Sequence, residues 1–328
     1  MDEDISSLNK HAQLYSQELN EITDEMHRVI VGQEDVLEKL ILALVADGHV
    51  LLEGMPGLAK TLMIKTLSDT IEASFKRIQF TPDLLPADIT GTRMYNQHTC
   101  QFTTKKGPIF ANFILADEIN RAPPKVQSAL LEAMQERQVT ISDESYVLEG
   151  PFLVMATQNP VETQGTYELP EAQVDRFMFK ILLDYPTQKQ EQEIIRMVAG
   201  GSIPHIRKII APSRIIKIQK FNHSIYMDEK ISKYITDIVQ TTRKPEEYGL
   251  DIKDFIEYGA SPRASIYLAL GGKAHAMLAG RGYVIPEDIK AIAKDVLRHR
   301  IILTYEAMAE DVTSDRIITS ILERVPVP

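Results

Sequence analysis

The chain has 328 residues, enough for about two domains, and its 44% hydrophobic and 25% charged residues are typical of a globular protein with a substantial core. Asp and Glu outnumber Lys and Arg by 46 to 36, and the net charge of −10 argues against binding to DNA or to an anionic membrane through bulk charge. The single cysteine, Cys100, excludes an intrachain disulfide. The N-terminus lacks the features of a signal peptide, and no apolar run is long enough to span a bilayer. We therefore expect a cytoplasmic protein with no membrane insertion.

The first predicted element is a helix over residues 1–28. Its apolar residues recur at steps of four and three, which places them on one face. The stripe is shorter than the heptad runs of a coiled coil, so we expect this helix to pack on the core of its own chain. The stripe consists of Leu8, Ala12, Tyr15, Leu19, Ile22 and Met26.

Residues 29–190 alternate between short apolar runs and helical patterns, which predicts crossover units and a parallel sheet covered by helices on both faces. A helix is expected at 60–71, and another carries Val126, Leu130 and Met134 on one face. The expected strands lie at 49–53, 75–80, 113–116, 152–156 and 177–183.

Two segments interrupt the alternation, at about 89–109 and 138–148, and both are predicted to be inserted β-hairpins. Beyond residue 185 the strand pattern disappears, and we expect a linker followed by a helical domain over 200–328. Helices are expected to begin after Thr187, Ser213, Asp228, Ser261 and Ile285.

Residues 54–61 read Gly-Met-Pro-Gly-Leu-Ala-Lys-Thr, between a predicted strand and a predicted helix. Unpaired backbone N–H groups and the helix dipole converge at such a turn, which favours binding of an anion. The two glycines allow the tight turn, Lys60 is placed to contact β- and γ-phosphates, and Thr61 to ligate Mg²⁺. Ala59 stands where the strict P-loop pattern has glycine, and we expect little cost because Ala59 enters the helix. A nucleotide-binding loop is favoured over an αβ turn without a ligand.

Two adjacent carboxylates follow the strand predicted at 113–116. Open parallel sheets bind ligands at the carboxyl ends of their strands. Asp117 is placed to hold a Mg²⁺ ion, and Glu118 to orient and deprotonate an attacking water. Such a pair alone would more often begin a loop, but beside a phosphate loop it indicates hydrolysis.

Three further polar residues are candidates. Asn159 ends another apolar strand and is placed to bond the γ-phosphate and the water, although a turn-forming Asn before Pro160 is equally compatible. Arg176 precedes the last predicted strand, and Arg263 lies in the first turn of a helix, where the helix dipole opposes a cation. An anionic partner would remove that conflict, although surface ion pairs would also explain both arginines.

Together these residues resemble the MoxR family of bacterial AAA+ ATPases, over a stretch from about Val31 to the end of the chain. The resemblance implies a P-loop AAA+ fold: an αβα sandwich with a parallel five-stranded sheet, two inserted β-hairpins and a C-terminal all-α lid domain. It rests on residues 54–61, on Leu-Ala-Asp-Glu-Ile-Asn-Arg-Ala-Pro-Pro-Lys-Val-Gln-Ser-Ala-Leu-Leu-Glu-Ala-Met at 115–134, on Ala-Thr-Gln-Asn-Pro at 156–160, and on Leu-Pro-Glu-Ala-Gln-Val-Asp-Arg-Phe at 169–177.

The resemblance also implies roles for individual residues. Lys60 and Thr61 match Walker A, and Asp117 and Glu118 match Walker B. Asn159 matches sensor 1, Arg263 sensor 2, and Arg176 the arginine finger that reaches the ATP of a neighbouring subunit. The residues expected to contact the nucleotide are Val31, Gly32, Gln33, Met55, Pro56, Gly57, Leu58, Ala59, Lys60, Thr61 and Leu62.

ATP and Mg²⁺ are the implied cofactors. The resemblance further implies a ring-forming, usually hexameric protein that remodels client proteins. Such proteins often work with a partner that carries a von Willebrand factor A domain. Three alternatives remain open: a DNA-translocating motor, for which the basic residues Arg93, Lys105 and Lys106 of the first insert argue, a magnesium-chelatase-type motor subunit, and a scaffold that binds ATP without hydrolysing it.

Overall fold

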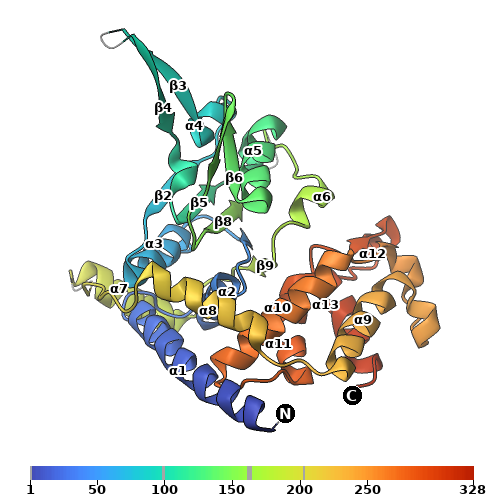
Figure 1. Ribbon diagram of the computed structural model, residues 1–328. Helices are drawn as coiled ribbons and strands as arrows, with labels where there is room; N and C mark the ends of the chain where they lie inside the picture. The colour runs from blue at the N-terminus through green and yellow to red at the C-terminus, as the bar shows by residue number, and fades with distance from the viewer. Residues whose placement is uncertain (1, 98–99, 161–164, 202–203) are drawn as a thin grey trace. The chain divides into compact units, whose positions relative to one another are not determined.

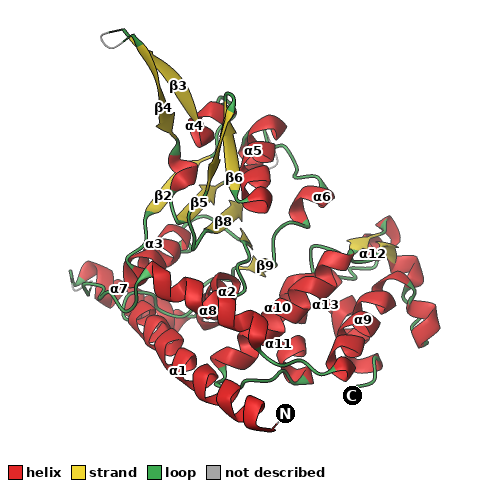
Figure 2. Ribbon diagram, in the orientation of Figure 1, coloured by secondary structure: helices red, strands yellow, loops and turns green. Residues whose placement is uncertain are grey.

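The computed structural model describes residues 2–97, 100–160, 165–201 and 204–328 (Figures 1 and 2). Contacts within the chain divide it into two compact units. The sheet unit comprises Glu21–Arg176 and Ile181–Ile216, and the helical unit comprises Met1–Asn20, Phe177–Lys180 and Lys217–Pro328. The segment 177–180, expected within the domain at 29–190, therefore groups with the helical unit.

A five-stranded sheet forms the centre of the sheet unit, in the order β2-β5-β8-β1-β9. The β2–β5, β5–β8 and β8–β1 pairs are parallel, as the alternation of strands and helices predicted. The fold class expected from the sequence is confirmed. The strands are β1 (Val50–Glu53), β2 (Phe75–Gln79), β5 (Phe113–Asp117), β8 (Leu153–Gln158) and β9 (Phe179–Leu182).

Helices connect these strands. The helix α3 contacts both β2 and β5, and its interior-facing residues are fully buried, including Met63, Ile64 and Leu67. The strands β5 and β8 are buried along nearly their whole length, as expected for central strands of a covered parallel sheet. The helices are α2 (Glu34–Val45), α3 (Lys60–Ile71), α4 (Pro86–Thr90), α5 (Pro124–Glu136), α6 (Glu171–Val174) and α7 (Gln188–Ala199).

Both predicted hairpins are present. The first pairs β3 (Gly91–Asn96) with β4 (Gln101–Lys106), and the second pairs β6 (Gln138–Ile141) with β7 (Glu144–Val147). Figure 1 shows them extending from the sheet on the side of α4 and α5. Three residues of the first hairpin, Met94, Tyr95 and Phe102, are more than half exposed, and the rings of Tyr95 and Phe102 contact each other.

The helical unit is not entirely helical, because Ile256–Tyr258 (β10) and Ile302–Leu303 (β11) form a short antiparallel pair that the sequence pattern did not indicate. Four of the five residues after which a helix was expected are N-caps, but α8 begins at Pro212 and so includes Ser213, the fifth of them. The helices that lie wholly in the helical unit are α9 (Glu229–Arg243), α10 (Pro262–Leu278), α11 (Pro286–Leu297), α12 (Tyr305–Ala309) and α13 (Ser314–Arg324).

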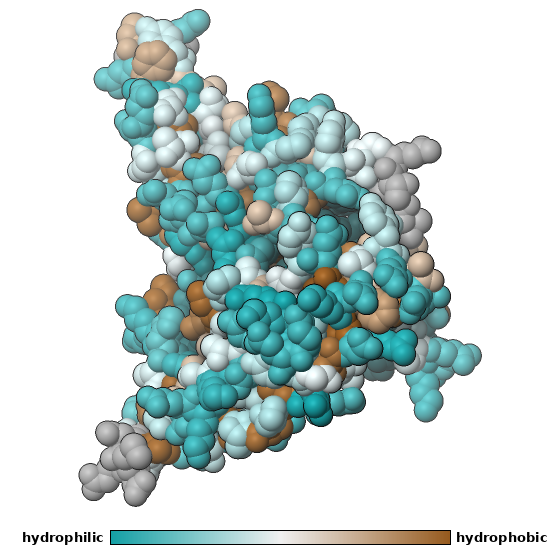
Figure 3. All heavy atoms as spheres, turned by 90° about the vertical axis from the view of Figure 1, so that its right-hand side faces the viewer, coloured by the Kyte–Doolittle hydropathy of each residue, from teal (hydrophilic) through white to brown (hydrophobic). Residues whose placement is uncertain are grey.

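Two long helices contribute residues to both units: α1 (Asp2–His27) and α8 (Pro212–Ser224). The predicted apolar stripe is the buried face of α1, where Ala12, Leu19 and Met26 are fully buried. Among the described helices, none combines the length and apolar character needed to cross a bilayer. On the face seen in Figure 3, hydrophilic side chains surround small apolar areas.

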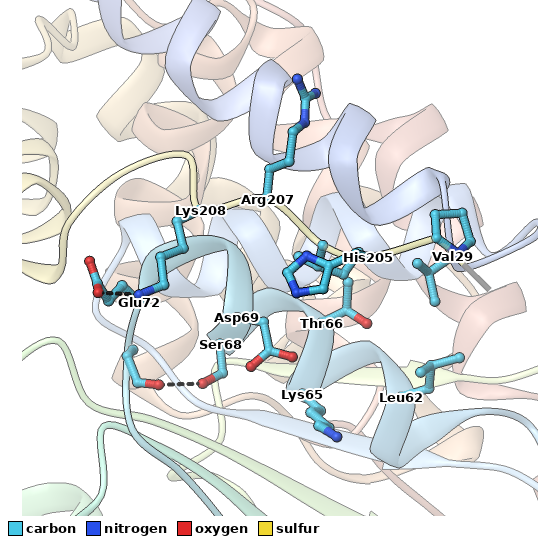
Figure 4. A pocket seen from close by; sticks show the side chains of 13 residues that line it. Val29, Leu62, Lys65, Thr66, Ser68, Asp69, Glu72, His205, Arg207 and Lys208 are labelled. Atoms are coloured by element: carbon cyan, nitrogen blue, oxygen red, sulfur yellow. Dashed lines mark hydrogen bonds and ion pairs between the residues drawn. The ribbon is translucent and has the colours of Figure 1, made fainter.

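A buried carboxylate anchors the segment after α7 within the sheet unit. Glu25 of α1 accepts hydrogen bonds from the Arg207 backbone N at 2.9 Å and from its Nε and Nη2 at 2.8 and 2.7 Å, and Arg28 also donates to it. The bond from Arg207 lowers the pKa of Glu25 to about 2, although burial acts in the opposite direction. Figure 4 shows this segment beside α3, where Lys208 pairs with Glu72.

Replacing Glu25 by glutamine is expected to lower the free energy of unfolding at neutral pH by about 1–3 kcal/mol, since charge-assisted hydrogen bonds are lost. The folded-state pKa lies below the ordinary 4.5, so the carboxylate stabilises the fold above pH 4.5, and this stabilisation is lost as the pH falls towards 2. The difference between wild type and variant in urea denaturation should therefore shrink through that window. Asp24→Asn, an exposed neighbour, is the control, and a difference that does not change with pH would contradict this role.

Candidate active site

The loop from β1 to α3 presents its backbone to an open cavity. Gly57 has φ of 87°, and a Cβ at this position would meet no atom within 4 Å. Ala59 has φ of 55° and is the N-cap of α3, outside the helix. The expectation that alanine enters the helix was therefore wrong: the position requires a left-handed backbone, which costs a non-glycine residue about 1–2 kcal/mol. The loop begins beside β8, because Gly54 N donates to Gln158 O at 3.3 Å.

Lys60 is the first residue of α3 and lies half-buried beside the carboxylates. Its Nζ donates to Gly54 O at 2.5 Å. Burial lowers the pKa of Lys60, and the negative charges of Asp117, Glu118 and Glu53 oppose this shift. The ammonium group is thus held where an anionic ligand would stabilise it in place of the backbone carbonyl.

A buried hydroxyl joins the Asp117 carboxylate to the backbone of Glu118. Thr157 of β8 donates from Oγ1 to Asp117 Oδ1 at 2.8 Å and accepts from the Glu118 backbone N at 2.8 Å. The parallel register between β5 and β8 brings these strand ends together. Glu118 has φ of 56°, so the chain turns sharply after Asp117. The carboxylates of Asp117 and Glu118 therefore point in different directions. Thr157 was not predicted as a site residue.

Two residues of β2 bond one further oxygen of Asp117 and one oxygen of Glu118. Arg77 donates from Nε and Nη2 to Asp117 Oδ2 at 3.0 and 2.6 Å. Gln79 is paired in register with Asp117, and its Nε2 donates to Glu118 Oε2 at 2.9 Å. Arg121 donates to the same Oε2 at 2.9 Å. Both carboxylates are therefore oriented by side chains from neighbouring elements.

These groups line one cavity of about 440 Å³ within the sheet unit. The cavity brings together Lys60, Thr61, Asp117, Glu118 and Asn159, all predicted as site residues. Its wall is completed by the loop residues Pro56, Gly57, Leu58 and Ala59, by Leu62 of α3, and by two residues that were not predicted, Arg77 and Thr157.

A smaller apolar cavity of about 140 Å³ shares Gly57, Leu58, Ala59 and Leu62 with the first. Two of the predicted residues, Val31 and Gln33, line it. Gly32 packs closely against α7, because a Cβ at this position would lie 2.5 Å from the side chain of Gln190. Met55 lines neither cavity. The other walls are Val29, Ile30, Pro186, Ile194, Met197 and Val198, so α7 closes one side.

The two predicted arginines are not among the described residues that line the cavity of about 440 Å³ in their own chain. Arg176 follows α6 in the sheet unit. Arg263 is the second residue of α10 in the helical unit, where its backbone N donates to the N-cap Ser261 Oγ at 3.2 Å. The sequence-based placement of Arg263 in the first helical turn is thus confirmed.

The donor set fits a magnesium–nucleotide complex. Mg²⁺ in phosphate sites is held by one or two protein oxygens together with phosphate oxygens and water, and Thr61 with Asp117 supplies such a pair. Within the described ranges, no group of three or more His, Cys, Asp or Glu side chains is arranged to hold a metal ion without further ligands. The open backbone at Gly57 and the ammonium of Lys60 suit polyphosphate.

Comparison with known proteins places this arrangement in a family. Residues 49–179 match the model of the ATPase family associated with various cellular activities (AAA), and residues 250–321 match that of the AAA lid domain. The chain is 47% identical to chaperone MoxR1 of Mycobacterium tuberculosis, over 93% of this chain and 81% of that protein. The chain belongs to the MoxR family of AAA ATPases.

Two further relatives agree with this membership. The uncharacterized protein YeaC of Bacillus subtilis is 44% identical over 94% of this chain and 95% of that protein. A solved structure from Cytophaga hutchinsonii, described as a presumed ATPase, is 50% identical and superposes with a TM-score of 0.93 over 98% of each chain. This MoxR-family protein is accordingly an ATPase, and the family resemblance inferred from the sequence is confirmed.

Proposed function

We propose that the cavity lined by Lys60 and the Asp117–Glu118 pair is the site of ATP hydrolysis. The observation that carries this proposal is the Thr157 hydroxyl, which bonds the Asp117 carboxylate and the Glu118 backbone at the carboxyl end of the sheet, in the same cavity as Lys60 and Thr61. In this assignment Lys60 binds the β- and γ-phosphates, and Glu118 is the general base that orients water and accepts its proton. Asn159 holds the same water from the end of β8.

Thr61 and Asp117 would hold Mg²⁺ in this site. The ion supplies charge neutralisation at the β- and γ-phosphates. Thr61 offers a hydroxyl from the first turn of α3, and Asp117 offers the carboxylate that Thr157 already orients. The protein thus presents the ligands in a fixed arrangement before the nucleotide arrives.

The apolar cavity is proposed to receive the adenine base. Val31 and Gln33 form one wall, and Ile194, Met197 and Val198 of α7 form another. Gln33 is held by a bond from its Nε2 to Asp184 O at 3.0 Å, which fixes the chain before α2. Because the two cavities share Gly57 to Ala59, one ligand can fill both.

Arg77 is expected to compete with the metal ion for Asp117, since its guanidinium bonds Oδ2 of the carboxylate that would hold the ion. Arg77→Met should therefore lower the Mg²⁺ concentration that half-saturates nucleotide binding by about threefold to tenfold. The measurement is fluorescence of a labelled ATP analogue titrated with Mg²⁺. Arg137→Met is the control, because that guanidinium bonds the carbonyls of Asp47 and Phe152. An unchanged or higher half-saturating concentration would contradict the competition.

We further propose that the protein assembles into a homo-oligomeric ring, with six subunits as the expected number, and remodels client proteins in the cytoplasm. Arg176 would complete the active site of the neighbouring subunit, and Arg263 would contact the nucleotide bound by its own subunit. The relative named chaperone MoxR1 supports a chaperone-like activity. A partner with a von Willebrand factor A domain is expected from the family resemblance.

The basic residues of the first hairpin give little support to the DNA-translocating alternative. Arg93 lies over the ring of Phe102 at 5.1 Å, and Lys106 lies over the rings of Phe110 and Tyr146 at 4.8 and 5.3 Å. These cations are thus engaged in contacts within the sheet unit. Salt-dependent stimulation of ATP hydrolysis by DNA would favour the alternative.

Native mass spectrometry with ATP and Mg²⁺ tests the ring assembly. The Glu118→Gln variant, which should retain ATP, is expected to give closed assemblies of six subunits, whereas Lys60→Ala should give fewer of them. A monomer of Glu118→Gln at saturating ATP would contradict the proposal. Steady hydrolysis by wild type distinguishes a motor from a scaffold that only binds ATP.

A further inference from the structure

The hydroxyl of Thr157 lies where the main-chain pairing of β5 with β8 stops. The parallel register of these two strands ends at the pair of Ala116 with Ala156. Immediately beyond this pair, Thr157 Oγ1 accepts a hydrogen bond from Glu118 N at 2.8 Å and donates one to Asp117 Oδ1 at 2.8 Å. A single side-chain oxygen therefore continues the connection between the strands at the point where the carboxylates begin.

The main chain of Thr157 is paired on its other side with β1. Thr157 is in register with Leu52, and the next pair joins Gln158 to Glu53. Gly54, which begins the loop to α3, donates from its backbone N to Gln158 O at 3.3 Å. Thr157 thus lies between the strand that leads into the phosphate loop and the strand that ends in the carboxylates. Its main chain pairs with the first strand, and its hydroxyl bonds the second.

The direction of both hydrogen bonds is fixed by chemistry. A hydroxyl has one hydrogen to donate, a carboxylate only accepts, and a backbone N–H only donates. The hydrogen on Thr157 Oγ1 therefore points at Asp117, and a lone pair of the same oxygen faces the N–H of Glu118. Thr157 is 1% exposed, so bulk water does not compete for either bond.

These bonds are compatible with a metal ion at Asp117. Arg77 also bonds this carboxylate, at Oδ2, but its positive charge opposes a cation at the same group. The hydroxyl of Thr157 is neutral and bonds the other oxygen, Oδ1. Its second bond is to the backbone of Glu118, so it fixes the main chain from which that side chain projects and occupies neither of its carboxylate oxygens.

We propose that Thr157 is a positioning residue for ATP hydrolysis, whose hydroxyl holds the metal ligand Asp117 and the base Glu118 in place relative to the phosphate loop. This inference rests on the proposed site of hydrolysis. Glu118 has φ of 56°, which is unfavourable for a residue with a side chain, and the bond to its N–H holds this turn. The bond to Asp117 sets the affinity for the ion, and the bond to Glu118 sets the rate once the ion is bound.

Thr157→Val removes the hydroxyl and keeps a β-branched side chain, which suits a strand. The kcat at saturating Mg²⁺ should fall by about 10–100-fold, since a displacement near 1 Å of a catalytic group has an effect of this size. The Mg²⁺ concentration that half-saturates binding of a labelled ATP analogue should rise about tenfold, because Asp117 loses the donor that orients it. The Kd of the analogue in EDTA should change by less than about twofold, because Lys60 and the loop are untouched.

Thr157→Ser separates positioning from packing. Serine keeps the oxygen and loses a buried methyl group, so it should retain kcat and the Mg²⁺ dependence within about threefold of wild type, whereas a packing role predicts that serine is worse than valine. Thr157→Cys, whose thiol is a weak donor and acceptor, should lie between them and serves if Thr157→Val does not fold. Thr70→Val is the matched control, because it removes a buried hydroxyl bonded to Leu67 O within α3 and should change neither quantity by more than about twofold.

A double variant shows through which residue the rate effect passes. If Thr157 acts through Glu118, then Glu118→Gln with Thr157→Val is no slower than Glu118→Gln alone. If Glu118→Gln turns over ATP as fast as wild type, the proposed site of hydrolysis itself fails. If Glu118→Gln is slow but Thr157→Val keeps the kcat and Mg²⁺ dependence of wild type, or if Thr157→Ser is as slow as Thr157→Val, the site stands and the positioning role is overturned. Rescue by serine, with unchanged affinity in EDTA, supports the role.

Discussion

Replacing Glu118 by glutamine should lower kcat for ATP hydrolysis by about 10²–10⁴-fold and leave nucleotide affinity within about threefold of wild type. Glutamine keeps the shape of the side chain, and its amide can still be held near Gln79 and Arg121. It cannot accept a proton from water. Phosphate release under steady-state conditions, together with equilibrium binding of a labelled ATP analogue, measures the two quantities.

Glu132→Gln provides the control. Glu132 is an exposed residue of α5, so this variant should hydrolyse ATP at the wild-type rate. Near-normal turnover by Glu118→Gln would contradict its assignment as the base. A parallel loss of binding and turnover would instead indicate that the carboxylate's charge holds the nucleotide complex together.

Mixing two inactive variants should restore hydrolysis. Lys60→Ala subunits lack a working phosphate site but retain Arg176, whereas Arg176→Ala subunits retain the site but cannot assist a neighbour. In a random equal mixture, about one quarter of the head-to-tail interfaces would pair an intact site with an intact arginine. Because such an arginine contributes about 10³–10⁵ in rate, this fraction should dominate the measured turnover.

The control mixture combines Arg176→Ala with the double variant Lys60→Ala, Arg176→Ala. No interface in it contains an arginine at 176, so turnover should stay at the level of the single variant. If the first mixture also stays at that level while native mass spectrometry shows mixed assemblies, the arginine does not act in trans.

The sequence predicted those helices and strands whose own turn residues and apolar periodicity match their place in the fold. The helix at Lys60–Ile71 was predicted with both ends correct, because a glycine-bearing turn precedes it and an apolar face runs along it. Asp117 and Glu118 were placed at a strand end, and the structure places them there. The hairpin at 138–148 was predicted because alternating apolar residues flank a polar turn, and the one at 89–109 because glycines flank short β-prone pieces.

The partners of the carboxylates could not be predicted in the same way. Arg77 and Gln79 reach Asp117 and Glu118 across about 40 positions of sequence, and only the register of β2 on β5 brings them together. Thr157 has no signal of its own within an apolar strand. Ala59 was misjudged for a local reason, because the residue type does not disclose a positive φ that the neighbouring turn imposes.

The helical unit shows the same limit. Arg298, His299 and Arg300 read as ordinary basic residues at the end of a helix, where cations are favoured by the helix dipole. Their bonds to the carbonyls of 177–180 span more than a hundred residues of chain. The short β10–β11 pair was missed because strands of two or three residues carry too little pattern to be recognised.

The most direct test of the central claim is a crystal structure of Glu118→Gln with ATP and Mg²⁺. We expect the triphosphate along the backbone of residues 54–60, Lys60 against the β- and γ-phosphates, and the ion shared between Thr61 Oγ1 and the carboxylate of Asp117, directly or through water. Nucleotide bound outside this cavity, or an ion whose shell excludes both Thr61 and Asp117, would contradict it.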